Sequence, residues 1–171
     1  MSRTIVLMGG TGAGKTTVGR ELAALLGEPF VDVDARIEAK TGRRIREIFA
    51  ADGEPAFRAL EVTATLEALK RPGVVALGGG APMTPAIAEA LRNQPVVVWL
   101  QVTPELAAKR VGGDPNRPLL RGADAPIRLK EMLDARTPTY AALATLTIEA
   151  SHGDSHRVAR ELARLLGKVQ P

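Results

Sequence analysis

Short apolar runs alternate along the chain with stretches in which apolar residues recur every three or four positions. The runs predict buried strands, which we place near residues 3–8, 29–33, 74–77, 96–100 and 145–149. The spaced stretches predict amphipathic helices between them. In the first of these helices the apolar stripe consists of Val18, Leu22, Leu25 and Leu26, and Gly27 ends it. Such regular alternation is typical of an α/β protein whose parallel sheet is covered by helices.

Glycine and proline positions set the expected helix boundaries. Residues 34–70 have a helical pattern that breaks near Gly42 and Gly53. Two later helices are expected to begin at Thr-Pro pairs, Thr84-Pro85 and Thr103-Pro104, with threonine as N-cap and proline as the first helical residue. A helix from about 126 to 136 should end or kink at Pro138, because proline lacks an N–H group.

The stretch 112–124 is rich in Gly, Pro, Asp and Arg, which suits neither helix nor strand. A loop of this length inside a domain is usually functional, and we expect it to act as a lid. The whole chain, 171 residues long, fits a single domain, with 34–70 and 112–124 as its two specialised regions.

Composition narrows the class of protein. Apolar residues make up 45% and charged residues 25% of the chain, as in ordinary soluble proteins. No apolar run approaches the length of a membrane span, no leader pattern precedes the first strand, and cysteine is absent, so we expect a cytoplasmic protein without membrane contact. The net charge of +4 does not predict nucleic-acid binding, because basic residues are scattered and only 3% of residues are aromatic.

A glycine-rich stretch lies between the first predicted strand and the first predicted helix. Its residues, Gly9 to Thr16, satisfy G-x-x-x-x-G-K-[ST], the phosphate-binding P-loop pattern. Backbone N–H groups of such a loop converge on phosphate oxygens, and the helix N-terminus adds partial positive charge. Lys15 is expected to reach the β- and γ-phosphates, and the Thr16 hydroxyl to bind Mg²⁺. A nucleotide site is therefore favoured over a glycine turn without a ligand.

Two carboxylates follow the second predicted strand. Asp32 and Asp34 should face the crevice at the carboxyl ends of the strands, near the P-loop. Alternation along a strand would separate their roles, so that one holds Mg²⁺ through water and the other accepts a hydrogen bond from a substrate hydroxyl. Alternatively, Asp34 only caps the following helix, and its position alone does not decide between these readings.

Three further patterns bear on the phosphate acceptor. Arg58 and Glu61 are three residues apart on a helix, which by itself favours an ordinary salt bridge over an arginine held ready for a carboxylate. Residues 78–80 are all glycine directly after a buried strand, which favours close approach of the backbone to a ligand. Arg117 lies in the predicted lid, where an arginine could stabilise a transferring phosphoryl group.

Taken in order, these motifs resemble the pattern of the shikimate kinase family from Ile5 nearly to the C-terminus. The family pattern has a P-loop, D-x-D, F-R-x-x-E, G-G-G, a lid R-P-L and R-x-P-x-Y. The matching stretches here are 9–16, 32–34, 57–61, 78–80, 117–119 and 136–140. Each short motif is weak alone, but six in the right order within one domain are specific. The chain has Thr16-Thr17 where the family usually shows Ser-Thr, and either hydroxyl can bind Mg²⁺.

The resemblance implies a three-layer α/β/α P-loop fold with a five-stranded parallel sheet, a helical substrate-binding insertion and a lid loop. It also implies the site residues. Catalysis falls to Lys15, Asp34 and Arg117. Substrate binding falls to Asp34, Arg58, Gly79, Gly80, Arg136, Phe49, Phe57 and Glu61. ATP binding falls to Gly12, Ala13, Gly14, Lys15, Thr16, Thr17, Arg110 and Arg117, with adenine helped by residues 151–154. Mg²⁺ is expected at Thr16 and Asp32.

The implied activity is ATP-dependent phosphorylation of the 3-hydroxyl of shikimate to shikimate 3-phosphate, a step of chorismate and aromatic amino-acid biosynthesis. The expected partners are ATP, Mg²⁺ and shikimate, and the expected state is a monomer. The alternatives are a gluconate, nucleoside monophosphate or other small-molecule kinase, or a catalytically silent switch that binds ATP. A gluconate kinase would carry a histidine soon after the second-strand carboxylates, and residues 35–38 contain none.

Overall fold

The computed structural model describes residues 2–111, 123–152 and 154–168. Its centre is a five-stranded sheet in the order β2-β3-β1-β4-β5, and all neighbouring strands pair in parallel. The strands are β1 (Thr4–Met8), β2 (Phe30–Asp32), β3 (Gly73–Ala76), β4 (Val96–Gln101) and β5 (Leu146–Glu149). The predicted α/β fold with a five-stranded parallel sheet is therefore confirmed.

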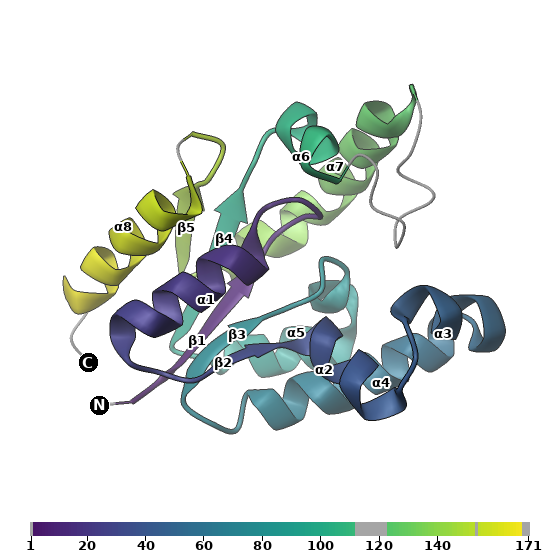
Figure 1. The fold of residues 1–171 in the computed structure, drawn as a ribbon, viewed down its shortest axis with the longest axis horizontal. Coiled ribbons are helices and arrows are strands. Elements are labelled where there is room, and N and C mark those ends of the chain that lie inside the picture. Colours follow the sequence, from purple (N-terminus) through teal and green to yellow (C-terminus); the bar gives the residue numbers. More distant parts are fainter. Residues whose placement is uncertain (1, 112–122, 153, 169–171) are drawn as a thin grey trace.

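Helices cover both faces of the sheet, which gives the predicted three layers (Figure 1). The helices are α1 (Lys15–Leu26), α2 (Val33–Thr41), α3 (Ile45–Asp52), α4 (Glu54–Ala68), α5 (Pro85–Arg92), α6 (Pro104–Val111), α7 (Ala125–Leu143) and α8 (Ser155–Lys168), with a 3₁₀ turn η1 (Ala81–Met83) before α5. The expected breaks at Gly42 and Gly53 and the expected starts at Pro85 and Pro104 are confirmed.

The central strand shows how the sequence assigns each face of the sheet. Ile5 and Leu7 of β1 join one buried cluster with residues of α1 and α8, whereas Val6 and Met8 join another with residues of α2, α4, α5 and α7. Successive side chains of a strand point to opposite faces, so a run that is apolar at every position is buried on both. This double burial fixes the central strand, and with it the loop that leaves its carboxyl end.

The predicted stripe of α1 is correct at three positions and wrong at one. Val18 and Leu22 are buried against the sheet and α8, and Leu26 packs partly buried against the same cluster, but Leu25 is 47% exposed. Ala23, which the stripe omitted, is buried instead. The buried face of α1 is set by its contact with α8, a partner that the periodicity of α1 cannot reveal.

The connection from β2 to α2 also departs from the prediction. The strand ends at Asp32, and α2 begins at Val33, so Asp34 lies in the first turn of a helix and not on the strand. Asp32 is the N-cap, because its Oδ1 accepts a hydrogen bond of 3.0 Å from the Ala35 amide. The alternative that Asp34 only caps the helix is therefore wrong, and the argument from strand alternation does not apply to this pair.

Pro138 does not end its helix, so the first of the two predicted outcomes, an end or a kink, is wrong. α7 continues from Ala125 to Leu143 with Pro138 inside it. Proline removes one backbone hydrogen bond, but the turn that follows is held from outside the helix. The ring of Tyr140 packs against Trp99, and its hydroxyl bonds to the backbone of Gly79. Tertiary contacts thus outweigh the local preference to stop.

The predicted lid lies between α6 and α7. Residues 112–122, and with them Arg117, fall outside the described residues, so the lid stays a prediction. Among the helices that the structure describes, none has the length and apolar character needed to cross a membrane.

Candidate active site

The functional residues gather at the carboxyl ends of three adjacent strands, β2, β3 and β1. The P-loop joins β1 to α1, Asp34 follows β2, and the glycine triplet 78–80 follows β3. Parallel strands point their carboxyl ends to one edge of a sheet, and ligands of open α/β sheets bind at that edge. Motifs about 70 residues apart in the sequence therefore meet at one place.

The P-loop conformation depends on glycine and on close packing. Gly12 has a φ of +81°, and a Cβ atom on it would lie 2.8 Å from the backbone oxygen of Ala107 in α6. Only glycine fits such a position. Lys15 folds back over the loop and donates hydrogen bonds to the carbonyl oxygens of Gly9, at 2.8 Å, and Gly10, at 2.9 Å. Its ammonium group therefore stands over the cradle that the motif predicts for phosphate.

The two predicted metal ligands are in direct contact. The Thr16 hydroxyl donates a hydrogen bond of 2.5 Å to Oδ2 of Asp32. The described residues contain no cluster of three or more His, Cys, Asp or Glu that could hold a metal by itself. Mg²⁺ rarely needs such a cluster, because it prefers oxygen ligands and usually binds one or two protein groups together with substrate phosphates and water. The Thr16 and Asp32 oxygens therefore fit a nucleotide-bound Mg²⁺.

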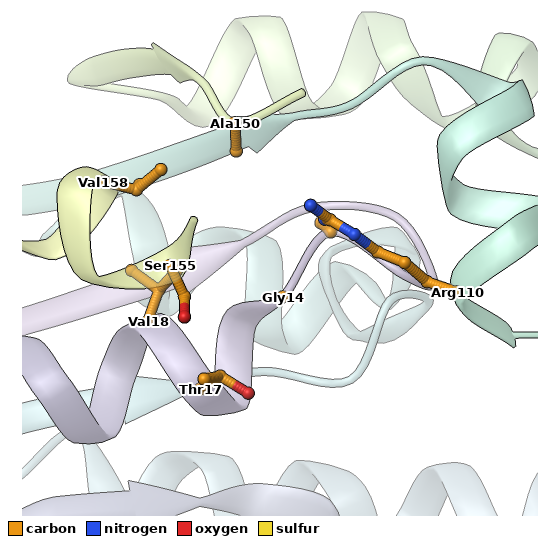
Figure 2. A pocket seen from close by; sticks show the side chains of 8 residues that line it. Gly14, Thr17, Val18, Arg110, Ala150, Ser155 and Val158 are labelled. Atoms are coloured by element: carbon orange, nitrogen blue, oxygen red, sulfur yellow. The ribbon is translucent and has the colours of Figure 1, made fainter. Parts of the chain in front are cut away.

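A hollow of about 200 Å³ lies on one side of the P-loop. Arg110 of α6 reaches across it and donates a hydrogen bond of 3.0 Å to the carbonyl oxygen of Gly12 (Figure 2). The hollow is lined by Ala13, Gly14, Thr17, Val18, Arg110, Ala150, Ser155 and Val158. A planar guanidinium opposite apolar side chains is suited to a flat heterocyclic base.

The other walls of this hollow were only partly predicted. Residues 151–154 were expected near adenine, but the lining residues flank that segment: Ala150 follows β5, and Ser155 and Val158 open α8. Ser151 is engaged elsewhere, because its hydroxyl accepts a hydrogen bond of 2.9 Å from the Thr103 amide. No local motif marks these walls. Only the packing of α8 on α1 brings them to the P-loop.

A second hollow, of about 150 Å³, lies on the other side of the P-loop. Its lining comprises Gly12, Gly14, Lys15, Thr16, Thr17, Asp32, Asp34, Leu77, Gly78 and Gly79. Asp34 thus shares one cavity with Lys15 and with the predicted metal ligands. A carboxylate in the same cavity as a phosphate cradle can accept a hydrogen bond from a hydroxyl group that is to be phosphorylated.

Charged side chains from three helices crowd against the glycine triplet. A Cβ atom on Gly80 would lie 2.6 Å from Nη2 of Arg58 in α4, and one on Gly79 would lie 3.0 Å from Nη1 of Arg136 in α7. A Cβ atom on Gly78 would lie 3.0 Å from both Oδ1 of Asp34 and Oε2 of Glu61. The absence of side chains is what lets both arginines and both carboxylates approach this backbone. The structure therefore brings together most of the predicted acceptor residues.

Arg58 and Glu61 form more than an ordinary surface salt bridge. Nη1 of Arg58 lies 2.6 Å from Oε1 of Glu61, whose side chain is only 1% exposed. Burial raises the pKa of Glu61, although the charges of Arg58 and Arg136 act in the opposite direction. Burial alone would lower the pKa of Arg58, but its hydrogen bonds and charge interactions with Glu61 and Glu54 outweigh burial and raise it. Arg58 is thus held as a fixed cation with its Nη2 against Gly80.

The aromatic pair stands at one side of Arg58. The rings of Phe49 and Phe57 are 4.7 Å apart between centroids, and Arg58 lies over the Phe57 ring at 5.3 Å. Phe57 is buried in the core, whereas Phe49 is 36% exposed. Phe49 is therefore the one of the two that can offer an open apolar surface to a ligand.

Tyr140 is a site neighbour to which the sequence assigned no role. Its hydroxyl donates a hydrogen bond of 2.6 Å to the carbonyl oxygen of Gly79, and burial raises its pKa. The signal was present in the R-x-P-x-Y motif, since residues 136 and 140 are four apart and share one face of a helix. Because a helix end was expected near Pro138, residues 136 and 140 were not predicted to lie on the same helix.

Comparison with known proteins gives a consistent result. The family model described as shikimate kinase matches residues 11–166. A shikimate kinase of Thermobifida fusca is 49% identical over 167 residues, which cover 97% of this chain and 94% of that protein. A shikimate kinase of Halorhodospira halophila is 45% identical over 163 residues, covering 95% of this chain and 92% of that protein.

Solved structures agree with this assignment. The shikimate kinase from Acinetobacter baumannii in complex with shikimate superposes with a TM-score of 0.93 at 39% identity, covering 99% of this chain and 97% of that one. Deoxyadenosine kinase from M. mycoides with bound dCTP superposes with a TM-score of 0.63 at 16% identity, covering 97% and 100%. The second likeness shows the shared kinase fold and nothing about the acceptor.

Proposed function

Because the chain belongs to the shikimate kinase family, we propose that it transfers the γ-phosphoryl group of ATP to the 3-hydroxyl group of shikimate. The product, shikimate 3-phosphate, belongs to aromatic amino-acid biosynthesis. One observation of this structure carries the proposal: Arg58 and Arg136, from separate helices, both stand against the glycine triplet beside Asp34 and the P-loop. This arrangement suits an acceptor with a carboxylate at one end and a hydroxyl at the other.

The nucleotide would occupy both sides of the P-loop. Its base fits the hollow beneath Arg110, and its phosphates fit the cradle under Lys15. Thr16 and Asp32 would hold Mg²⁺, which neutralises the charge of the β- and γ-phosphates when it is bound. The hydrogen bonds that Lys15 now makes to Gly9 and Gly10 would be exchanged for phosphate oxygens.

The acceptor carboxylate would be held by the two arginines. A guanidinium fork binds a carboxylate through two parallel, charge-assisted hydrogen bonds, and Glu61 keeps one of the forks in place. Phe49 would offer its exposed edge to the ring of the acceptor. A neutral polyol would leave the arginines without a partner, which costs about 1–3 kcal/mol for each buried group left unpaired. The clamp therefore favours an acid over a sugar.

The transfer itself needs little from the protein beyond position and charge. The acceptor hydroxyl oxygen forms a bond to the γ-phosphorus as the bond from that phosphorus to the β–γ bridging oxygen breaks, and ADP leaves. Asp34 orients the hydroxyl and accepts its proton, and Lys15 stabilises charge on the phosphate oxygens. Arg117, which lies outside the described residues, keeps its predicted role at the phosphate.

The remaining expectations belong to this proposal. We infer that residues 1–171 work as one kinase domain, in which α2 to α4 bind the acceptor and 112–124 form the lid. We further propose that the protein acts as a monomer in the cytoplasm and binds no nucleic acid.

The deciding experiment measures ADP release from Mg·ATP with shikimate, with gluconate, with a nucleoside monophosphate, and with no acceptor. We expect release to depend strongly on shikimate and to be near background with the other three. Release driven by another acceptor would keep the fold and overturn the clamp. Binding of ATP without any acceptor-dependent release would show a nucleotide switch in place of a kinase.

A further inference from the structure

α7 holds a single residue of the glycine triplet at two points. Nη1 of Arg136 stands against the Cα of Gly79, and one turn later the Tyr140 hydroxyl donates its hydrogen bond of 2.6 Å to the Gly79 carbonyl oxygen. Of these two side chains, only Arg136 carries a charge that could bind an anionic substrate. The contact of Tyr140 is with the backbone of Gly79.

The bond to the Gly79 oxygen fixes the direction of an N–H group. A trans peptide is planar, with its C=O and N–H pointing in opposite directions, so fixing the Gly79 oxygen also aims the Gly80 N–H. Glycine residues restrain their own backbone little, and three in a row would otherwise leave this peptide free to rotate. The restraint has to come from outside the triplet.

The N–H groups of this segment are without acceptors in the described part of the chain. Neither the Gly79 nor the Gly80 amide donates a hydrogen bond to any described residue, although Gly80 is buried. Buried backbone N–H groups are nearly always bonded, so a pair of open donors beside Arg58 and Arg136 indicates a place for a ligand acceptor atom.

We propose that Tyr140 is a positioning residue for the acceptor: its hydroxyl locks the Gly79–Gly80 peptide so that the Gly80 N–H faces the substrate between the two arginines. This inference rests on the proposed kinase function. It assigns Tyr140 no contact with the substrate and no part in proton transfer.

Tyr140 is well suited to act as a rigid anchor. Its ring is 1% exposed and packs against Trp99 at 5.8 Å between centroids. Burial also raises its pKa, so the hydroxyl stays protonated and remains a donor throughout the neutral range. The Tyr140 ring is thus held in place by Trp99 of β4, while its hydroxyl donates a hydrogen bond to Gly79.

The test replaces Tyr140 with phenylalanine, which removes the hydroxyl and keeps the ring. We expect the KM for shikimate to rise about 5- to 30-fold, because the free energy of one well-formed hydrogen bond would be lost from substrate binding. The KM for ATP should stay within about twofold of the parent value. Binding of shikimate without nucleotide, measured by calorimetry, should weaken by the same factor as the KM for shikimate rises.

Thr4→Val is the matched control. The Thr4 hydroxyl also donates to a backbone carbonyl, that of Arg71 at 2.9 Å, and is nearly as buried at 9% exposure, but it lies at the opposite end of the sheet. We expect a loss of stability comparable with that of Tyr140→Phe and unchanged KM values for both substrates. The pair thus separates a stability effect from a positioning effect.

The outcomes are distinct. An unchanged shikimate KM in Tyr140→Phe, with the parent protein active on shikimate, would overturn the positioning role and leave the proposed function intact. Equal rises in both KM values would show general loosening of the site and would also overturn it. A parent protein without shikimate-dependent turnover would overturn the proposed function itself.

Discussion

The nucleotide half and the acceptor half of this site are built in different ways. The phosphate cradle of the nucleotide half is one continuous stretch, Gly9 to Thr16, formed by its backbone and a single lysine. The acceptor half is assembled from charged side chains of α2, α4 and α7, which meet only at the glycine triplet. The cradle needs a local conformation, whereas the acceptor half needs three helices in their correct places.

This difference explains why the phosphate cradle does not select the acceptor, whereas the acceptor half does. A cradle of backbone N–H groups recognises phosphate in many proteins and says nothing about what receives it. A pair of arginines at a fixed separation recognises a carboxylate at a fixed distance from the reacting hydroxyl. The likeness to deoxyadenosine kinase, at 16% identity, shows a shared fold alone.

The largest expected effect lies where the two halves meet, at Asp34. We expect Asp34→Asn to lower kcat about 10²- to 10³-fold, because an amide can neither accept the proton nor orient the hydroxyl as a carboxylate does. The KM for ATP should change less than about threefold, since the cradle is untouched. Steady-state ADP release measures both constants. The control is Asp52→Asn, which removes only an exposed partner of Arg43. If kcat of Asp34→Asn fell by less than about fivefold, the catalytic role of Asp34 would be contradicted.

The intermediate effect compares one arginine from each half. Arg136→Ala should raise the KM for shikimate about 10- to 100-fold and leave the KM for ATP nearly unchanged, because it removes a charge-assisted bond to the carboxylate. Arg110→Ala should do the reverse, raising the KM for ATP about 3- to 10-fold, since Arg110 is exposed and faces only the base hollow. Equal rises in both KM values in either variant would break the division into halves.

The smallest effect concerns the buried carboxyl of the acceptor half. Glu61 has a pKa above its ordinary 4.5 in the folded protein, mainly because burial opposes its charge. Its protonation therefore favours folding, fully below pH 4.5, and this contribution is lost as pH rises through the folded-state pKa. The Gln side chain of Glu61→Gln does not titrate. The free energy of unfolding of the parent minus that of the variant should thus decrease with rising pH in urea titrations, and a constant difference would contradict the assignment.

The two halves also differ in how far the sequence predicts them. Strand, glycine loop and helix lie side by side in the chain, so the P-loop and its lysine are predicted from local pattern alone. Arg58 and Glu61 show only a three-residue spacing, which an exposed salt bridge would share. What distinguishes them is that Glu61 is 1% exposed beneath the triplet, and only the resemblance to a family could indicate this beforehand.

Two of the errors of prediction have the same origin. The exposure of Leu25 and the passage of α7 through Pro138 follow from contacts with distant elements, whereas the early start of α2 follows from the local N-cap of Asp32. The walls of the base hollow, Ala150 and Ser155, belong to no motif and reach the P-loop only through packing. Local preference decides a structure where no stronger tertiary contact opposes it.

The linings of the two hollows beside the P-loop have two residues in common, Gly14 and Thr17. This shared wall connects the two hollows and is therefore of interest for inhibitor design. A compound that joins a flat base to a cyclic carboxylic acid can pass over Gly14 and Thr17 and fill both hollows at once. Its effective concentration at the second hollow would be set by the linker, and its selectivity over other P-loop kinases would come from the acid end alone.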